Sequence, residues 1–238
     1  MEATIDRLKI GVLGLSEGAG TGFLVASLAK ALVDQGYFPA VLELGKGGLF
    51  DSLGMDKLFA GRDFFSFHNA AANDRSIRGR RNELGGINWA LIPSEEGLAS
   101  LDLYRKIRLL NNLIGDVVVS RMSGIKEEEL WKLAWEMDRI LVVIDPLPSK
   151  MLEGYELLCN LKLSELPIVY VVNKYNKGVN RRQLLSYLKL KKLKYIPMID
   201  YKAVYGAEYT CRTAYDIPHA KNALMGPLNE LIDELIIM

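Results

Sequence analysis

A glycine-rich segment near the start of the chain has residue types and a spacing that suit phosphate binding. Glycines at Gly14, Gly18 and Gly20 keep a glycine-rich frame. The two positions that follow are Thr21 and Gly22, where the phosphate-loop pattern G-x-x-x-x-G-K-[ST] has Lys and then Ser or Thr. The loop geometry of an anion cradle is therefore present in the sequence, whereas the lysine that meets the β- and γ-phosphates is absent.

The elements on either side of this segment would position it for such a role. Residues 10–15 form a short apolar run that suits a buried strand, and residues 24–33 repeat apolar side chains at helical spacing before Gly36. A strand, a glycine loop and a helix in that order point backbone N–H groups at an anion. The alternative interpretation is a glycine turn that only packs the helix closely against the strand.

The chemistry of the loop is weaker than its geometry. The hydroxyl that would hold magnesium is missing unless Thr21 shifts into that role, and Glu17 adds a negative charge beside the expected anion. Each missing part matters because phosphoryl transfer depends on positioned cations, metal and an oriented water.

Composition limits the class of protein. The 238 residues are 50% hydrophobic and 25% charged with a net charge of +1, which indicates one globular domain over residues 1–238 and no strong nucleic-acid signal. The cysteines, Cys159 and Cys211, form no metal-ligand pattern and suit a reducing, cytoplasmic compartment. The polar start, residues 1–9, lacks the core of a signal peptide, and no apolar run reaches the ~20 residues of a transmembrane helix.

Strands and helices alternate along the chain. Apolar runs predict about seven strands, at residues 10–15, 38–44, 87–92, 116–120, 139–145, 167–172 and 195–199. Helical spacing predicts helices at residues 24–33, 98–113, 127–137, 149–161, 180–190 and 227–237. This order predicts an α/β fold with a mainly parallel, doubly wound sheet and helices on both faces. Ligands of such sheets bind at the carboxyl ends of the strands, where the glycine loop lies.

Residues 8–236 resemble the MinD/ParA group of P-loop ATPases. The resemblance is carried by the first strand with SEGAGTGF, by LELG at the end of the second strand, by VVNKYNKGVNRRQLLSYL at residues 171–188 and by the segment 196–216. It implies the P-loop NTPase fold, ATP or ADP as ligand, and a homodimer.

Several positions depart from what the resemblance implies. Ser16 stands where the family has the lysine that reaches across a dimer, and Thr21 and Gly22 replace the loop lysine and the magnesium-binding threonine. In the Asp-x-Asp after the second strand, the first position is Glu43 and the second, associated with hydrolysis, is Gly45. We treat these two as possible switch positions. These changes leave magnesium in doubt and predict weak or absent ATP hydrolysis, with no catalytic residue and no metal ligand assigned.

Candidate nucleotide-binding residues follow from the loop and the resemblance. Arg121 lies at or beside the place of a family aspartate and has two interpretations: a substitute cation for phosphate, or a salt bridge to Glu43 or Glu17. Asn173 matches the adenine-reading asparagine, or else caps a turn at a strand end. The complete candidate set is Gly14, Gly18, Ala19, Gly20, Thr21, Gly22, Arg121 and Asn173.

The resemblance and its departures together predict a degenerate MinD/ParA-like protein that acts as a dimerising localisation or assembly factor. Atypical members such as the TadZ-like proteins of pilus assembly loci depart from the usual loop in comparable ways, which suggests a protein partner in a membrane-associated pilus or secretion assembly. The alternatives are an active ATPase with non-standard phosphate and metal residues, and a small-molecule ATP-dependent enzyme of the same fold.

Three other segments carry weaker signals. The basic stretches 75–81 and 189–194 suit solvated surface better than nucleic acid or lipid. The aromatic segment Phe64 to Phe67 suits either a pocket lining or the core.

Overall fold

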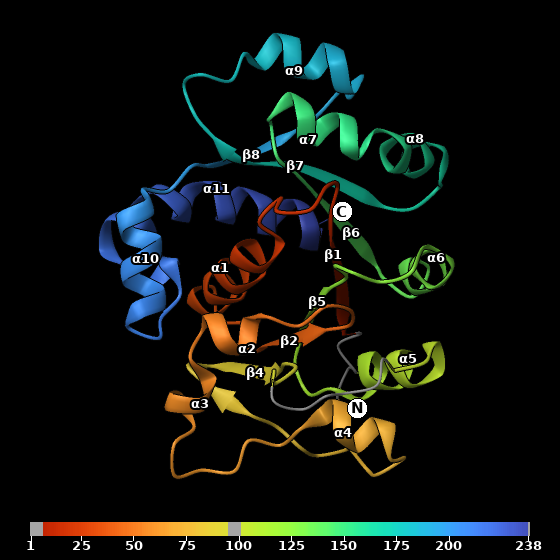
Figure 1. Ribbon diagram of the computed structural model, residues 1–238, viewed down its shortest axis with the longest axis vertical. Helices are drawn as coiled ribbons and strands as arrows, with labels where there is room; N and C mark the ends of the chain where they lie inside the picture. Colours follow the sequence, from red (N-terminus) through yellow and green to blue (C-terminus); the bar gives the residue numbers. More distant parts are fainter. Residues whose placement is uncertain (1–6, 95–100, 238) are drawn as a thin grey trace.

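The computed structural model describes residues 7–94 and 101–237, and the chain folds around one eight-stranded sheet (Figure 1). Its order is β3-β4-β2-β5-β1-β6-β7-β8, and every neighbouring pair is parallel except β3 and β4. The strands are β1 (Leu8–Gly14), β2 (Pro39–Glu43), β3 (Glu83–Leu84), β4 (Ile87–Ala90), β5 (Val117–Arg121), β6 (Arg139–Ile144), β7 (Ile168–Tyr175) and β8 (Lys194–Pro197).

Eleven α-helices and one 3₁₀ turn connect and cover these strands within the described residues. They are α1 (Thr21–Asp34), α2 (Leu49–Ser52), α3 (Met55–Leu58), α4 (Phe67–Ala72), α5 (Leu103–Asn112), α6 (Glu127–Ala134), α7 (Pro148–Glu153), α8 (Tyr155–Leu163), α9 (Arg181–Leu188), α10 (Tyr201–Tyr209), η1 (Ala214–Asp216) and α11 (Pro218–Ile237). No helix of the described residues is long and apolar enough to cross a membrane.

Both faces of the sheet are buried because each central strand is apolar on both sides. In β5, Val117 and Val119 pack into one core cluster while Val118 packs into the other. The first cluster lies under α1, α11 and the short helices after β2, and the second lies under α4 to α9. Figure 1 shows α1, α10 and α11 on one side of the sheet and α5, α6 and α8 on the other.

The predicted fold class is confirmed, and the predicted strands each correspond to a strand of the sheet. The eighth strand, β3, could not be predicted from hydrophobic periodicity because it has only two residues. It pairs antiparallel with β4 at the edge of the sheet. The predicted helix at 98–113 corresponds to α5, and its first residues, 98–100, lie outside the described residues.

Two predicted helices have different bounds. The single helix expected at 149–161 is divided into α7 and α8 at Gly154, where a Cβ would lie 2.1 Å from the carbonyl oxygen of Leu15. The last helix begins at Pro218 rather than at Pro227, which lies inside it. Buried side chains along its length, including Ala220 and Leu224, hold it against the core through the proline.

Candidate functional site

The glycine loop joins the carboxyl end of β1, the central strand between β5 and β6, to the start of α1. Gly18 and Gly20 have positive φ angles of 77° and 88°, a conformation that favours glycine. A Cβ on Gly20 would also lie 2.3 Å from Nδ2 of Asn173. The fold therefore requires glycine at position 20, both for close packing against Asn173 and for the backbone conformation.

Two side chains from the carboxyl end of β7 hold this loop. Asn173 is buried, and its Nδ2 donates to the carbonyl oxygen of Ala19 at 2.9 Å. The ammonium of Lys174 donates to the carbonyl oxygen of Gly18 at 2.7 Å and to Oδ2 of Asp145 at 2.6 Å. The side chain of Asn173 therefore binds the glycine loop rather than capping a turn at the end of its own strand. Its expected contact with adenine remains a prediction.

Lys174 and Asp145 are not among the candidate residues predicted from the sequence. Asp145 follows the carboxyl end of β6 and is 3% exposed, and its pairing joins the ends of β6 and β7 to the loop. The signal that would have found them is the Asn-Lys pair at the end of a buried strand, together with an acidic residue directly after the neighbouring strand. Strand order was needed to place the two ends side by side.

Arg121, at the carboxyl end of β5, forms the centre of a network around the start of α1. Its Nη1 donates to Oε1 of Glu43 at 2.9 Å and to the carbonyl oxygens of Lys46 and Gly47 at 2.9 and 3.1 Å. Its Nε donates to Oγ1 of Thr21 at 3.4 Å. Of the two interpretations, the ion pair with Glu43 is present, and a role in phosphate binding remains a prediction.

Glu43 is fully buried at the end of β2 and has all its contacts inside the protein. Besides Arg121, the backbone N–H groups of Leu49 and Ile92 each donate to its carboxylate at 3.0 Å. Burial raises the pKa of Glu43, while the two backbone hydrogen bonds and Arg121 lower it in part. The carboxylate is thus held by the protein on both oxygens. His68, which donates from Nε2 to the carbonyl oxygen of Glu43 at 2.6 Å, is buried beside it, and burial lowers its pKa.

The other switch position, Gly45, lies where two loops meet. A Cβ at this position would lie 2.1 Å from the carbonyl oxygen of Ser123, to which the backbone N–H of Lys46 donates at 2.7 Å. The loop after β2 is therefore fastened directly to the loop after β5. A side chain of any size at position 45, an aspartate included, would require these loops to separate.

The start of α1 can accept an anion. Within the described residues, no hydrogen bond engages the N–H groups of Gly20, Thr21 and Gly22, which lie at the positive end of a 14-residue helix. These groups fit a phosphate. The exposed Glu17 beside them forms an ion pair with Lys46 at 3.6 Å. This pairing partly neutralises the positive charge of Lys46.

The same place does not fit magnesium. The hydroxyl of Thr21 lies 2.9 Å from Oγ of Ser123 and accepts from Arg121, so it is already engaged. Both oxygens of Glu43 accept hydrogen bonds from the protein. Among the described residues, no group of three or more His, Cys, Asp or Glu side chains is placed to hold a metal ion.

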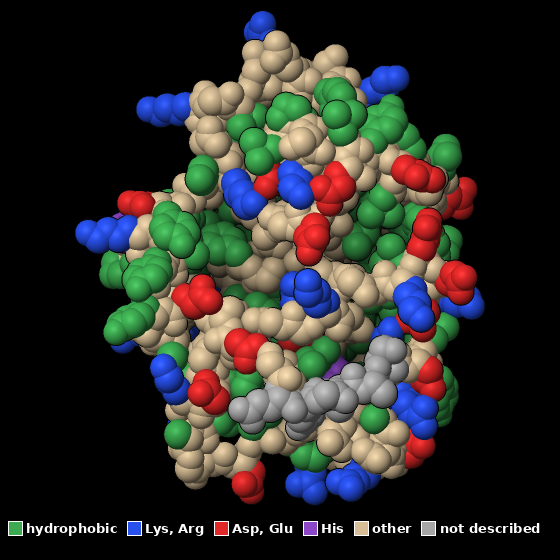
Figure 2. Space-filling view, in the orientation of Figure 1, with side chains coloured by type: hydrophobic (Ala, Val, Ile, Leu, Met, Phe, Trp, Pro, Cys, Tyr) green, Lys and Arg blue, Asp and Glu red, His purple; other side chains and the backbone are tan. Residues whose placement is uncertain are grey.

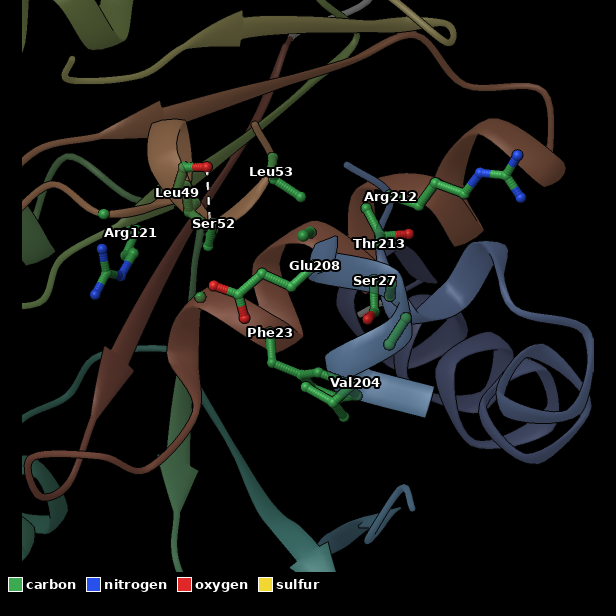
Figure 3. A pocket seen from close by; sticks show the side chains of 15 residues that line it. Phe23, Ser27, Leu49, Ser52, Leu53, Arg121, Val204, Glu208, Arg212 and Thr213 are labelled. Atoms are coloured by element: carbon green, nitrogen blue, oxygen red, sulfur yellow. Dashed lines mark hydrogen bonds between the residues drawn. The ribbon is translucent and has the colours of Figure 1, made fainter. Parts of the chain in front are cut away.

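A cavity of about 280 Å³ opens beside this network, between α1, α2 and α10 (Figure 3). Gly22 is among the residues that line it. Figure 3 shows Arg121 at one end, with Arg212 and Thr213 at the other. In Figure 3 the carboxylate of Glu208 extends from α10 toward the end where Arg121 lies. The cavity therefore continues the site from the loop toward α10.

The remaining candidates from the sequence make no hydrogen bond to Arg121 among the described residues. Gly14 ends β1, where a Cβ would lie 3.1 Å from the carbonyl oxygen of Ser16. Phe67 is fully buried, and Phe64 packs edge-to-face against the ring of Phe59, so the aromatic segment fills the core. In the basic stretches, Lys192 and Lys194 pair with Glu234, Arg81 pairs with Glu83, and Arg80 lies over the ring of Phe65.

Solved structures with the same fold cover nearly the whole chain. MinD from Pyrococcus horikoshii OT3, solved with Mg-ADP, matches with a TM-score of 0.74 and 17% identity over 96% of this chain and 97% of that one. A ParA family ATPase from Chlorobium tepidum TLS matches with a TM-score of 0.76 and 15% identity over 99% and 100%. A plasmid partition protein from Borrelia burgdorferi B31, bound to AMPPNP, matches with a TM-score of 0.70 and 14% identity over 97% and 100%.

Sequence comparison adds nothing to these matches. No protein-family profile matches the chain, and no curated protein matches it at a significant level. The likeness thus lies in the path of the backbone, at an identity below one residue in five. The resemblance predicted from the sequence is confirmed as a likeness of structure: the chain has the α/β P-loop NTPase fold of the MinD/ParA ATPases.

Proposed function

We propose that this chain is a MinD/ParA-like protein that does not hydrolyse ATP and acts as a dimerising localisation or assembly factor. On this proposal it binds a nucleotide weakly and without magnesium through its glycine loop. The role would be carried out by binding other proteins rather than by turnover.

The observation that carries the proposal is the Arg121 network. ATP hydrolysis needs a cation and a metal on the phosphates and a group that orients the attacking water. Here the residues nearest the start of α1 are engaged with one another: Thr21 with Ser123 and Arg121, and Arg121 with Glu43. Freeing them for a nucleotide would break a buried ion pair, so the arrangement supports a structural role for these side chains.

Weak nucleotide binding is supported by the backbone rather than by side chains. The N–H groups of Gly20, Thr21 and Gly22 are available to a phosphate, and the helix dipole adds a favourable field. The loop lysine and the magnesium threonine, which would each add a charged contact, are Thr21 and Gly22. The complexes of two neighbours with Mg-ADP and AMPPNP support nucleotide binding by a chain with this fold.

The assembly role is supported by one neighbour and by the resemblance. MinD from Aquifex aeolicus has been solved in a complex with MinC, with a TM-score of 0.71 to this chain. A protein with this fold thus binds a second protein. We extend this to a partner in a membrane-associated assembly, of the kind that the TadZ-like resemblance suggests, with the chain located in the cytoplasm or at the membrane through that partner.

Calorimetric titration with ATP and ADP, each with and without magnesium, tests the proposal when it is followed by a phosphate-release assay. We expect weak binding that is the same with and without magnesium, and phosphate release at the uncatalysed rate. Gly22→Asp places a carboxylate at the start of α1 and should abolish binding, while Gly22→Asn, the neutral control of the same size, should keep it. Magnesium-dependent binding with phosphate release would overturn the proposal.

A further inference from the structure

A second cavity, of about 670 Å³, lies between α7 and α9, and most of the residues that line it are apolar. On the α7 side, Leu147 and Leu152 are 57% and 65% exposed, and on the α9 side Tyr187 is 39% exposed. Met151 and Leu184, which belong to the buried core, also line it. Contiguous apolar side chains at a surface mark binding sites in soluble proteins. We call this cavity the α7–α9 groove.

The protein itself holds both walls of the α7–α9 groove. On the α7 side, Oε1 of Glu153 accepts from the backbone N–H of Glu17 in the glycine loop at 2.8 Å. On the α9 side, Oδ1 of Asn180 accepts from two backbone N–H groups of the first turn at 3.1 Å. The ring of Tyr187 lies 6.1 Å from the ring of Tyr155 on α8. A groove that is already formed requires little ordering when it binds a ligand.

The part of the chain that forms the α9 side of the groove is strongly basic. Residues 166–199 contain eight Lys and Arg side chains and no Asp or Glu, whereas the net charge of the whole chain is +1. Lys177 is exposed between Asn176 and Gly178, which both line the groove. Lys174 lines it directly. Figure 2 shows Lys and Arg as the charged side chains at the top of the molecule, where Figure 1 places α9. The groove therefore combines an apolar lining with a positive electrostatic field.

We propose that the α7–α9 groove binds an amphipathic helix of a protein partner, and that this helix carries acidic residues along its flanks. Apolar side chains at helical spacing would occupy the groove, as helices do in hydrophobic grooves of other proteins. The flanking carboxylates would lie beside Lys174 and Lys177. Asp145, the acidic residue among those that line the groove, is buried in its ion pair with Lys174, so it does not oppose this charge pattern. The inference rests on the proposed function, because it names the surface and the chemistry of the partner that this function requires.

Charge and shape select this occupant over two others. A second copy of the chain that docked through the same groove would bring two basic surfaces together, and like charges across an interface are unfavourable. An anionic membrane would suit the charge. However, Leu147 and Leu152 line a hollow, and a bilayer takes up apolar side chains that project from a helix face.

Fluorescence anisotropy with two labelled synthetic helices, without nucleotide, tests the groove. Both helices carry leucines at positions i, i+3, i+4 and i+7, and their other faces carry glutamates in one and lysines in the other. We expect a micromolar dissociation constant for the glutamate helix and binding at least about tenfold weaker for the lysine helix. Higher salt should weaken the binding of the glutamate helix, because it screens the charges at the rim.

Matched variants locate the binding surface. Leu152→Asp puts a carboxylate on the α7 side of the groove, and Lys177→Glu reverses the charge on the α9 side. Each should weaken binding of the glutamate helix at least about tenfold, and the neutral Leu152→Asn and Lys177→Gln should weaken it less. Leu163→Asp on α8, where the side chain is 84% exposed, and Lys132→Glu on α6 should leave binding unchanged. Circular dichroism checks that each variant keeps the fold.

Four results would overturn the inference. The first two are binding of neither helix and equal or tighter binding of the lysine helix. The third is binding that ignores both Leu152→Asp and Lys177→Glu. The fourth is loss, in these same variants, of a dimer in sedimentation velocity or of binding to phosphatidylglycerol vesicles, which would assign the groove to a second copy or to lipid. These substitutions leave the glycine loop intact, so phosphate release would overturn the proposed function while the result for the groove still stands.

Discussion

Removing the Arg121 side chain should destabilise the fold by leaving a buried carboxylate without its cation. In Arg121→Met, Glu43 keeps its two backbone hydrogen bonds but loses the guanidinium, and its side chain is 0% exposed. Breaking a buried pair in this way costs about 3–5 kcal/mol unless the carboxylate takes up a proton. Protonation limits the cost to about 1.4 kcal/mol for each pH unit above the ordinary pKa of 4.5, so we expect a loss of at most about 3 kcal/mol at pH 7.

The loss of stability in this variant should depend on pH. Burial already raises the pKa of Glu43, and the loss of Arg121 removes one of the contacts that lower it. A carboxyl with a raised folded-state pKa contributes stability below its unfolded pKa, and that contribution is lost as the pH rises through the folded-state value. The difference between wild type and Arg121→Met should therefore be small near pH 5 and grow toward pH 7.

Urea unfolding at pH 5, 6 and 7, with thermal melts as a second readout, measures this difference. A loss of about 3 kcal/mol corresponds to a fall in melting temperature of about 6–12 °C for a chain of this size. Arg121→Lys keeps the charge and should lose less, and Arg78→Met, at an exposed arginine, should lose almost nothing. A loss below about 1 kcal/mol at pH 7, or one of equal size at pH 5 and pH 7, would refute the structural role assigned to Arg121.

Two further changes test how the loop is held. Gly20→Ala should destabilise the protein by about 1–3 kcal/mol, because φ is 88° and the new Cβ would lie 2.3 Å from Nδ2 of Asn173. The control Gly226→Ala, which has open space around it in α11, should instead stabilise the protein by about 0.5–1 kcal/mol. Lys174→Met should cost about 1–2 kcal/mol in urea unfolding, since it leaves the 4%-exposed Asp145 side chain without its cation while Lys174 itself is 41% exposed. The exposed Lys177→Met is the matched control, and an equal loss in both would contradict the role of Lys174.

Most of the sheet could be predicted because a strand buried on both faces is a nearly continuous apolar run. Residues 117–119 and 140–144 carry that signal without reference to any neighbour. Helix α10 could not be predicted in the same way, because three of its nine residues are exposed tyrosines and its buried residues are only Ala203 and Ala207. The first half of α11 was missed for a related reason: Pro227 resembles a helix start, and only tertiary packing carries the helix through it.

The contacts of the site were less predictable than its position. The glycine loop, Arg121 and Asn173 follow strands whose carboxyl ends meet at one edge, and that edge could be inferred from the alternation of elements. The partner of each side chain depends on strand order, which brings the end of β5 between β2 and β1 and so places Arg121 beside Glu43. Lys174 needed the same information, because its partner Asp145 comes from the neighbouring strand β6.

The glycines of the loop have a structural explanation that does not depend on phosphate chemistry. Gly20 is required because the side-chain amide of Asn173 packs against it. Gly154, at the break between α7 and α8, is required because the carbonyl of Leu15, at the start of the loop, packs against it. Asn173 and Lys174 together donate to two consecutive loop carbonyls, so the loop is fixed by the protein without any ligand. A loop held in this way keeps its shape when the lysine and the magnesium threonine are absent. The geometry of the loop alone is therefore no evidence for ATP hydrolysis. Hydrolysis depends on the charged groups that face the loop.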